Sequence, residues 1–367
     1  MDKVDKEYEH RVMTLEKKGQ GILGIHHVTA IARDPQKNFD FYAGILGLRL
    51  VKMTVNFDDI TTYHLYYGDE LGRPGTILTF FPWKNIPQGR RGTGEVVTIS
   101  FLIPQNAIEY WSNTFRDKGV EHSEPTKRFE NNEQVITFYD TDGLKLELVA
   151  NKEAENREKN AWKNGPVPAD YAIRGLYCVT LSLEGYDRTA SLLTNEIGFS
   201  MIAHEENRFR FQLKDKFIES SLKDIDSNEN QKSMHSTSSI VDIVCLPYTQ
   251  PGTIGAGTVH HVAWRTPTDE SQLEMRKKIT RTRLSATPVI DRLYFHSVYF
   301  REPGGVLFEI ATDLPGFLID QKTEDLGQNL VLPKWLEPKR GYIEKTLPSL
   351  DVTNIANVNR QKRTGGV

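Results

Sequence analysis

The chain has 367 residues, of which 38% are hydrophobic and 26% charged, so it can bury a sizeable core, and disorder is not expected over most of its length. The net charge is −3 and the 46 basic residues are scattered, which argues against a nucleic-acid-binding protein. With two cysteines, and no apolar stretch near the roughly 20 residues that span a bilayer, we expect a cytoplasmic protein without disulfides or membrane contact.

A strand-like segment, often following a glycine, recurs four times, about every 70 to 80 residues. Each copy continues with a helical pattern and then with alternating strand-like segments that end in an apolar run. In the first three copies a glycine closes the helical segment, as expected at a helix C-terminus. The repeating unit is therefore predicted to be βαβββ. The four first strands are expected at residues 24–32, 96–101, 175–181 and 257–264, and the four closing runs at 76–80, 144–148, 240–244 and 306–310.

These repeats divide the chain into regions. The polar segment 153–170 contains two prolines and is typical of a linker. The regions we expect are a charged N-terminal extension (1–20), modules one and two (21–150), a linker (151–172), modules three and four (173–320) and a C-terminal tail (321–367).

Two His-His pairs occupy the same place in copies one and four. They are His26-His27 and His260-His261, out of only ten histidines in the chain. Neighbouring strand residues point to opposite faces, so we expect one histidine of each pair to face a shared cavity and the other to lie behind it or at the rim. Glu309 lies inside the apolar run of copy four, where a carboxylate is costly unless it is paired or metal-bound. Two imidazoles and one carboxylate form the facial triad of non-haem Fe(II) oxygenases, which leaves positions open for substrate and O₂.

Comparison of the four copies tests this prediction. The histidine position becomes Val96 in copy two and Cys178 in copy three, while Phe80 is expected at the Glu309 position of copy one. Glu147 and Asp242 keep a carboxylate without a histidine, so we expect solvent-facing or paired structural acids there. Because only copies one and four carry the histidines, these two copies should pair around one metal, leaving copies two and three to each other.

The pattern resembles the vicinal oxygen chelate superfamily, which includes glyoxalase I and the extradiol dioxygenases. It is most similar to the para-hydroquinone ring-cleaving dioxygenases, from about residue 22 to residue 345. The segments that carry the resemblance are 25–29, 63–72, 74–76, 260–263, 299–301 and 303–309. The implied fold is α+β, with four βαβββ modules forming two incomplete β-barrels.

The resemblance also implies a site and a reaction. The metal ligands would be the second histidine of each pair, His27 and His261, together with Glu309. The implied metal is Fe(II), with Mn(II) as the alternative, and the implied partners are a small aromatic diol and O₂; the sequence is also compatible with a homo-oligomer. Four residues are implied as catalytic groups close to the metal: His26, His260, Arg292 and Tyr299.

Each of these groups also has a plainer interpretation. Tyr299 could be a strand tyrosine that is hydrogen-bonded at a barrel rim, and Arg292 could pair with Asp291 at the surface. His64 is interpreted as a packed strand histidine and Trp264 as a core residue.

Rival functions exist on the same scaffold. Glyoxalase-type isomerases need a fourth protein ligand, for which Glu147 is the only candidate. A metal-free protein that sequesters small molecules would have no use for two matched His-His pairs.

Overall fold

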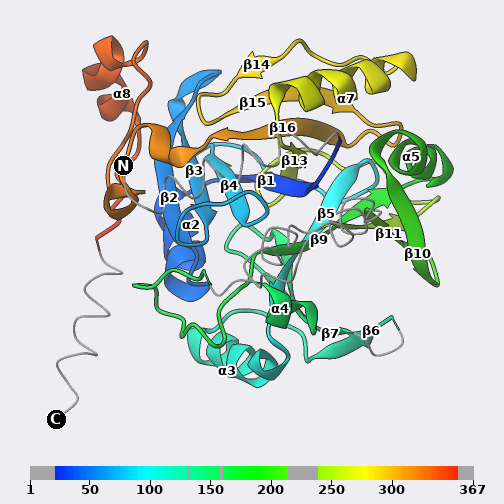
Figure 1. The fold of residues 1–367 in the computed structure, drawn as a ribbon. Coiled ribbons are helices and arrows are strands. Elements are labelled where there is room, and N and C mark those ends of the chain that lie inside the picture. Colours follow the sequence, from blue (N-terminus) through cyan, green and yellow to red (C-terminus); the bar gives the residue numbers. More distant parts are fainter. Residues whose placement is uncertain (1–20, 130–132, 158–159, 214–238, 354–367) are drawn as a thin grey trace, which may run out of the picture.

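The computed structural model describes residues 21–129, 133–157, 160–213 and 239–353. The predicted N-terminal extension and the last part of the tail lie outside these residues. The described chain forms two eight-stranded sheets, and the strands of each sheet come from two modules (Figure 1). No helix among the described residues is both long enough and apolar enough to cross a membrane.

The first sheet combines modules one and four, which confirms the predicted pairing of these copies. Its strand order is β14-β15-β16-β13-β1-β4-β3-β2. The strands of module one are β1 (Gly24–Ala32), β2 (Arg49–Asn56), β3 (Asp59–Gly68) and β4 (Ile77–Pro82), and those of module four are β13 (Val259–Thr266), β14 (Ile290–Asp291), β15 (Phe295–Arg301) and β16 (Leu307–Pro315).

The second sheet combines modules two and three in the same manner, with the order β10-β11-β12-β9-β5-β8-β7-β6. The two first strands, β5 and β9, pair antiparallel at its centre, as β1 and β13 do in the first sheet. Its strands are β5 (Glu95–Ile103), β6 (Thr126–Arg128), β7 (Glu133–Tyr139), β8 (Lys145–Ala150), β9 (Leu176–Leu183), β10 (Phe199–Glu205), β11 (Arg208–Leu213) and β12 (Ile240–Cys245). The α+β fold with two incomplete barrels is thereby confirmed.

A helical segment follows the first strand of each module, as the repeat predicts. In modules one and three the helix runs on into a short π-helical segment, and Gly119 and Gly198 cap their helices in the left-handed conformation. The helical segments are α2 (Pro35–Phe39) with η1 (Asp40–Ile45), α3 (Ile108–Lys118), α5 (Asp187–Leu192) with η3 (Leu193–Ile197), and α7 (Asp269–Arg281).

The segments outside the modules pack onto them. The linker region contains the short helix α4 (Glu153–Asn156), and the C-terminal region contains α8 (Arg340–Thr346). Figure 1 shows α8 beside β2 and β3, where the Tyr63 hydroxyl donates a 3.0 Å hydrogen bond to the Pro348 carbonyl. The described part of the tail therefore covers one edge of module one.

The outer faces of both sheets share one large apolar core with the helices. Trp264 belongs to this core and is fully buried between Phe199 and Phe308, as predicted. A second, smaller cluster lies inside the first half-barrel and contains Val51, Tyr66, Ile77, Ala263, Tyr294, Phe295, Ala311, Phe317 and Leu326. This inner cluster fills one part of the half-barrel next to the histidine pairs.

Candidate metal centre

The two histidine pairs meet because β1 and β13 are adjacent and antiparallel. In this register His27 lies opposite Ala263, and His261 lies opposite Thr29. The register between β1 and β13 shifts twice in this region. One shift lies between Ile25 and His27, and the other lies between Thr29 and Ala30. Such β-bulges insert an extra residue and redirect its side chain, and they are common next to active sites.

The bulges break the simple alternation that the sequence predicts for each pair. His26 Nδ1 lies 2.9 Å from His27 Nδ1, and His260 Nδ1 lies 2.7 Å from His261 Nδ1. Neighbouring side chains on opposite faces of a regular strand could not approach so closely. Each pair therefore presents one imidazole to the centre and a second imidazole directly behind it.

Three ligand atoms converge at the centre, and all three side chains are buried. Glu309 Oε2, from β16, lies 2.9 Å from His261 Nε2 and 3.3 Å from His27 Nε2. The two Nε2 atoms are 3.3 Å apart. Ligands at adjacent positions of one metal stand about 3.0 Å apart when each is about 2.1 Å from the ion. The three residues named from the sequence therefore form one group that could hold a metal ion.

The chemistry of these atoms also fits a cation. Glu309 Oε2 is fully buried yet accepts no well-directed hydrogen bond. If the Nδ1 atoms of His27 and His261 carry the protons shared with the histidines behind them, both Nε2 atoms present lone pairs to this oxygen. Three buried lone pairs that face one point repel one another unless a positive charge lies between them.

The other carboxylate oxygen of Glu309 is held in place by the protein. Ser297 Oγ, on the neighbouring strand β15, donates a 2.5 Å hydrogen bond to Glu309 Oε1. Burial by itself would raise the pKa of Glu309, but when His27 and His261 instead turn protons toward this carboxylate they outweigh burial and hold its pKa well below the usual range. The carboxylate is thus charged and oriented, as a ligand must be.

His26 and His260 lie behind the imidazoles of His27 and His261, each with its Nδ1 within hydrogen-bond distance of theirs. Burial, reinforced by the adjacent histidine, lowers the pKa of His26 well below its usual value and that of His260 to about 3. A neutral imidazole can accept a hydrogen bond from the Nδ1–H of the ligand in front of it, which fixes the ligand's tautomer.

Tyr299 lies against the ring of His261, and Arg292 lies over the ring of Tyr299. The rings of Tyr299 and His261 are 5.6 Å apart in an edge-on contact, and the Arg292 guanidinium lies 5.5 Å from the Tyr299 ring centre. Arg292 pairs with Asp58 at 3.0 Å rather than with Asp291, the partner considered from the sequence. Burial, and next Glu309, raise the pKa of Tyr299, so its hydroxyl is protonated at neutral pH.

A polar chain beside the centre was not predicted from the sequence. The Tyr66 hydroxyl lies 2.8 Å from His64 Nδ1, and His64 Nε2 lies 2.8 Å from Thr79 Oγ1. Thr79 Oγ1 in turn lies 3.0 Å from the hydroxyl of Thr29, which faces His261. The spacing of His64 and Tyr66 on a strand, both facing one side, was the available signal. His64 is a packed strand histidine as predicted, but its partners connect it to the centre.

Internal symmetry of the first sheet explains this chain and corrects the alignment. Ala263 pairs with Glu309 on β16, and the equivalent residue Thr29 pairs with Thr79 on β4. Copy one therefore carries Thr79 at the Glu309 position, and the expectation of Phe80 was wrong by one residue. Counting residues from Pro74 and Pro303 could not detect the different turn lengths that precede β4 and β16.

The same register identifies the equivalent positions in the second sheet. Thr98 lies opposite Thr180 across β5 and β9, and Cys178 lies opposite Ser100. Ser100 pairs in turn with the carboxylate residue Glu147, and Thr180 pairs with Asp242. Thr98, rather than the expected Val96, is therefore the copy-two equivalent of the ligand histidines, while Cys178 is confirmed in copy three.

Of the two expectations for Glu147 and Asp242, paired structural acids is confirmed and solvent-facing acids is wrong, because both side chains are buried. Arg128 Nη1 lies 3.1 Å from Glu147 Oε2, and Arg210 Nε lies 2.7 Å from Asp242 Oδ1. Arg208 also pairs with Asp242 at 2.9 Å. In the second sheet, guanidinium groups thus neutralise the carboxylates at the place where the first sheet gathers the group that could hold a metal ion.

Comparisons with known proteins agree with this geometry. Residues 24–148 match the model of the Glyoxalase/Bleomycin resistance protein/Dioxygenase superfamily. The chain is 43% identical over 333 residues to "Putative ring-cleaving dioxygenase MhqO" of Bacillus subtilis, covering 91% of this chain and 98% of that protein.

Two further matches extend over most of the chain. One is "Chlorohydroquinone/hydroquinone 1,2-dioxygenase" of Sphingobium indicum, 28% identical and covering 88% of this chain and 95% of that protein. The other is the crystal structure of a putative dioxygenase from Bacillus subtilis, with 42% identity, a TM-score of 0.81 and coverage of 91% of this chain and 99% of that chain. The chain therefore belongs to the glyoxalase/bleomycin resistance protein/dioxygenase superfamily, among relatives named as ring-cleaving dioxygenases.

Proposed function

We propose that this protein is an Fe(II)-dependent dioxygenase that opens the ring of hydroquinone-type aromatic diols with O₂. The observation that carries the proposal is the buried group of His27, His261 and Glu309, which brings one ligand atom of each residue together at a single place. A set of three protein ligands leaves coordination positions open, which a reaction between two small molecules requires. The names of the full-length relatives supply the substrate class and the reaction.

Iron is the proposed metal, and manganese is the alternative that the same ligands accept. When bound, the metal would accept the ionised diol oxygen and transfer electron density from the ring to O₂. The protein supplies the geometry. The Nδ1 contacts from His26 and His260 and the Ser297 hydroxyl fix the orientation of the three ligands before any substrate arrives.

Arg292 and Tyr299 are proposed to bind and orient the diol. The Arg292 guanidinium is held by Asp58 and lies over the ring of Tyr299, so its charge faces the same side of the centre as the tyrosine. A cation at this place favours an ionised phenol oxygen, and the protonated Tyr299 hydroxyl can donate to an oxygen on the ring.

Proton transfer is needed because the hydroxyl that binds at the metal must lose its proton and an oxygen of the opened ring must gain one. Tyr299 is one candidate for this role. The other is His64, whose two ring nitrogens both lie at hydrogen-bond distance from hydroxyl groups, those of Tyr66 and Thr79. A histidine bonded on both sides can take up a proton on one nitrogen and release one from the other.

The isomerase alternative lacks a fourth ligand. Among the described residues, the metal-ligand group has three members. The position related to Glu309 by internal symmetry is Thr79, whose hydroxyl is bonded to His64 and Thr29. Glu147, the candidate named from the sequence, lies in the other sheet and is paired with Arg128.

Anaerobic loading with Fe(II), followed by O₂ uptake with a panel of hydroquinones and catechols, tests the proposal. We expect one O₂ consumed per diol with loss of the aromatic absorbance, and no uptake by the His261→Ala variant. Turnover of a methylglyoxal–thiol hemithioacetal by the nickel- or zinc-loaded protein, without O₂ uptake by the iron form, would replace the dioxygenase by an isomerase. A wild-type protein that binds no divalent metal would favour the metal-free sequestering protein instead.

A further inference from the structure

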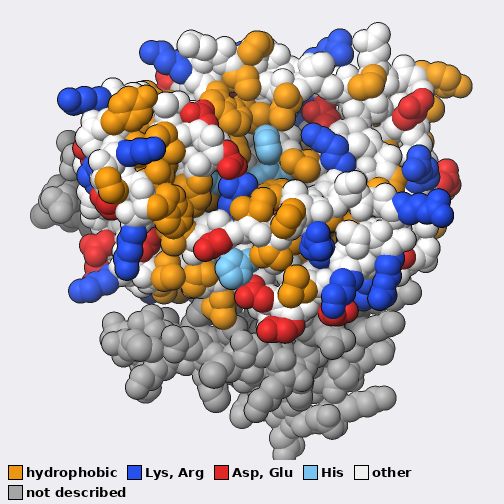
Figure 2. Space-filling view, turned by 90° about the horizontal axis from the view of Figure 1, so that it is seen from above, with side chains coloured by type: hydrophobic (Ala, Val, Ile, Leu, Met, Phe, Trp, Pro, Cys, Tyr) orange, Lys and Arg blue, Asp and Glu red, His pale blue; other side chains and the backbone are white. Residues whose placement is uncertain are grey.

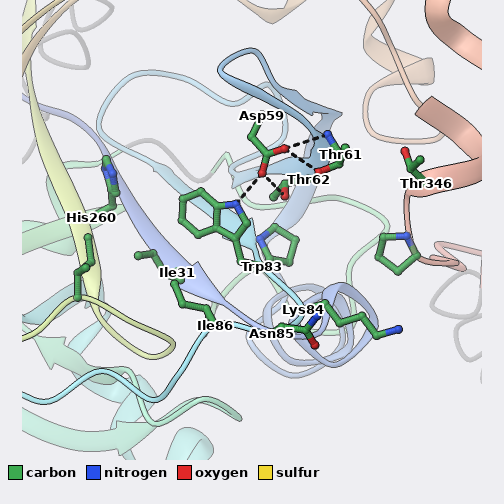
Figure 3. A pocket seen from close by; sticks show the side chains of 13 residues that line it. Ile31, Asp59, Thr61, Thr62, Trp83, Lys84, Asn85, Ile86, His260 and Thr346 are labelled. Atoms are coloured by element: carbon green, nitrogen blue, oxygen red, sulfur yellow. Dashed lines mark hydrogen bonds between the residues drawn. The ribbon is translucent and has the colours of Figure 1, made fainter. Parts of the chain in front are cut away.

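A cavity of about 640 Å³ lies at the end of β1 and β4 in the first half-barrel (Figure 3). Its lining combines apolar side chains with threonine hydroxyls, and Thr62 lies beside Trp83. The lining residues used below are Ile31, Thr62, Trp83, Ile254 and His260. Figure 3 shows His260 and Thr346 at opposite ends of this cavity, with Trp83 between them.

Strand β1 and the side chain of His260 connect the cavity to the metal centre. His27, Thr29 and Ile31 alternate along β1, so Ile31 lies about 13 Å from His27 on the same side of the sheet. His260 lines the cavity while its Nδ1 contacts the ligand His261. On the other side of the centre, the inner apolar cluster that includes Phe295 packs against His26 and His27. The cavity therefore borders the centre through His260.

The aromatic wall of the cavity is held rigidly. The Trp83 indole N–H donates a 3.0 Å hydrogen bond to Asp59 Oδ2, which also accepts from the Thr62 hydroxyl. Thr61 occupies the other oxygen of Asp59 through both its backbone N–H and its hydroxyl. Because these bonds engage both carboxylate oxygens, Asp59 fixes the indole ring and presents no free acceptor to the cavity. The ring of Phe81, 5.2 Å from that of Trp83, continues the aromatic surface towards His260.

The size and lining of this space exceed what a plain diol needs. A single ring bound at the metal does not extend as far as Ile31 and Trp83, and a pocket of several hundred cubic ångströms suits a larger molecule. Trp83, Ile31 and Ile254 offer such a molecule an aromatic and aliphatic surface, beside polar side chains such as Thr62 and Lys84. Figure 2 shows the face seen from above, where hydrophobic side chains lie beside histidine side chains and lysines and arginines are scattered among them.

We infer that this cavity is a subsite for an apolar ring substituent, so that the preferred substrates are hydroquinones that carry an alkyl chain of several carbons or a second aromatic ring. The inference rests on the proposed function, because it assumes that the diol end binds at the metal. In this arrangement the substituent lies along Trp83 and Ile31, and Ile254 covers it from the loop side.

The first test compares kcat/KM for unsubstituted hydroquinone and n-hexylhydroquinone in the iron-loaded protein. Each buried methylene contributes about fourfold in binding, so the hexyl compound is expected to exceed hydroquinone by at least about tenfold. Trp83→Ala is expected to lower this ratio at least about fivefold, and the ratio cancels any loss of folded or metal-loaded protein. Ile254→Asp places a charge on a residue that is 62% exposed, where misfolding is not expected, and should lower the ratio in the same direction.

Trp335→Ala is the matched control, since this tryptophan is 54% exposed and does not line the cavity. It should leave the ratio unchanged. Equal kcat/KM for the two diols, or a ratio that Trp83→Ala and Ile254→Asp leave unaltered, would overturn the inference.

A second test does not depend on turnover. Binding of phenol and 4-hexylphenol to the metal-free protein is measured by calorimetry, and 4-hexylphenol should bind at least about tenfold more tightly, with the difference reduced in Trp83→Ala. If this difference is found while no diol consumes O₂, the subsite stands and the proposed reaction fails. If O₂ is consumed but the two phenols bind equally, the reaction stands and the subsite is refuted.

Discussion

The hydrogen bond between Ser297 and Glu309 provides a sharp test of the metal centre. Ser297 Oγ donates a 2.5 Å hydrogen bond to Glu309 Oε1, and within the described residues no other donor to this oxygen is found. Ser297→Ala removes this bond and changes none of the three proposed ligand residues. A hydrogen bond to a charged group is worth about 1.5–3 kcal/mol. Loss of a partner that orients a metal ligand typically costs about 10- to 100-fold in metal affinity, which is about 1.4–2.7 kcal/mol. The two estimates agree, so we expect a 10- to 100-fold weaker metal site.

The assay is an anaerobic competition titration of Fe(II), with Zn(II) as a redox-inert check, against a chromophoric chelator. Ser100→Ala is the matched control, because Ser100 Oγ lies 2.7 Å from Glu147 Oε2 at an equally buried place in the second sheet. Both variants lose a buried serine–glutamate bond, and both should unfold at lower urea concentration. Only Ser297→Ala should lose metal affinity. Unchanged affinity in Ser297→Ala, or an equal loss in Ser100→Ala, would refute the reasoning.

Three further predictions concern stability. A divalent metal at about 1,000 times its Kd should raise the unfolding free energy of the wild type by about 4 kcal/mol, and a similar gain in His261→Ala would place the ion elsewhere. Arg210→Met should destabilise the fold by about 3–5 kcal/mol in urea unfolding, since it leaves the buried Asp242 and Glu133 carboxylates without this guanidinium; a loss below 1 kcal/mol would contradict that role. Burial raises the pKa of Asp140 to about 6, so the folded state binds this proton more tightly than the unfolded chain does. The stability of the wild type relative to Asp140→Asn should therefore increase as the pH falls from 7 to 4, and a pH-independent difference would refute it.

Much of the fold follows from local patterns in the chain. The period of the repeat, the apolar closing runs and the helix-ending glycines are local features, and each predicted first strand and closing run is present in the structure. The pairing of modules one and four also followed from the sequence, because His27 and His261 lie far apart along the chain and can share one metal only if their strands meet. Side-chain type alone thus predicted which distant segments are neighbours.

Strand register decided what the sequence left open or misplaced. Thr79 and Thr98, rather than Phe80 and Val96, occupy the equivalent positions, because turn lengths between strands differ among the copies. The bulges that bring both histidines of a pair together are equally invisible in a pattern that assumes strict alternation.

The sequence by itself determined the four modules and the sharing of one site between copies one and four. Those properties depend on residue type and period, which the chain carries locally. Which histidine of each pair faces the site followed only from the resemblance to a known family. Only the tertiary structure decided that Arg292 pairs with Asp58, that His64 is linked through Thr79 to the centre, and that Trp83 lines a cavity beside His260. These contacts join side chains from loops and strands that no sequence period relates, so their positions depend on how the whole half-barrel closes.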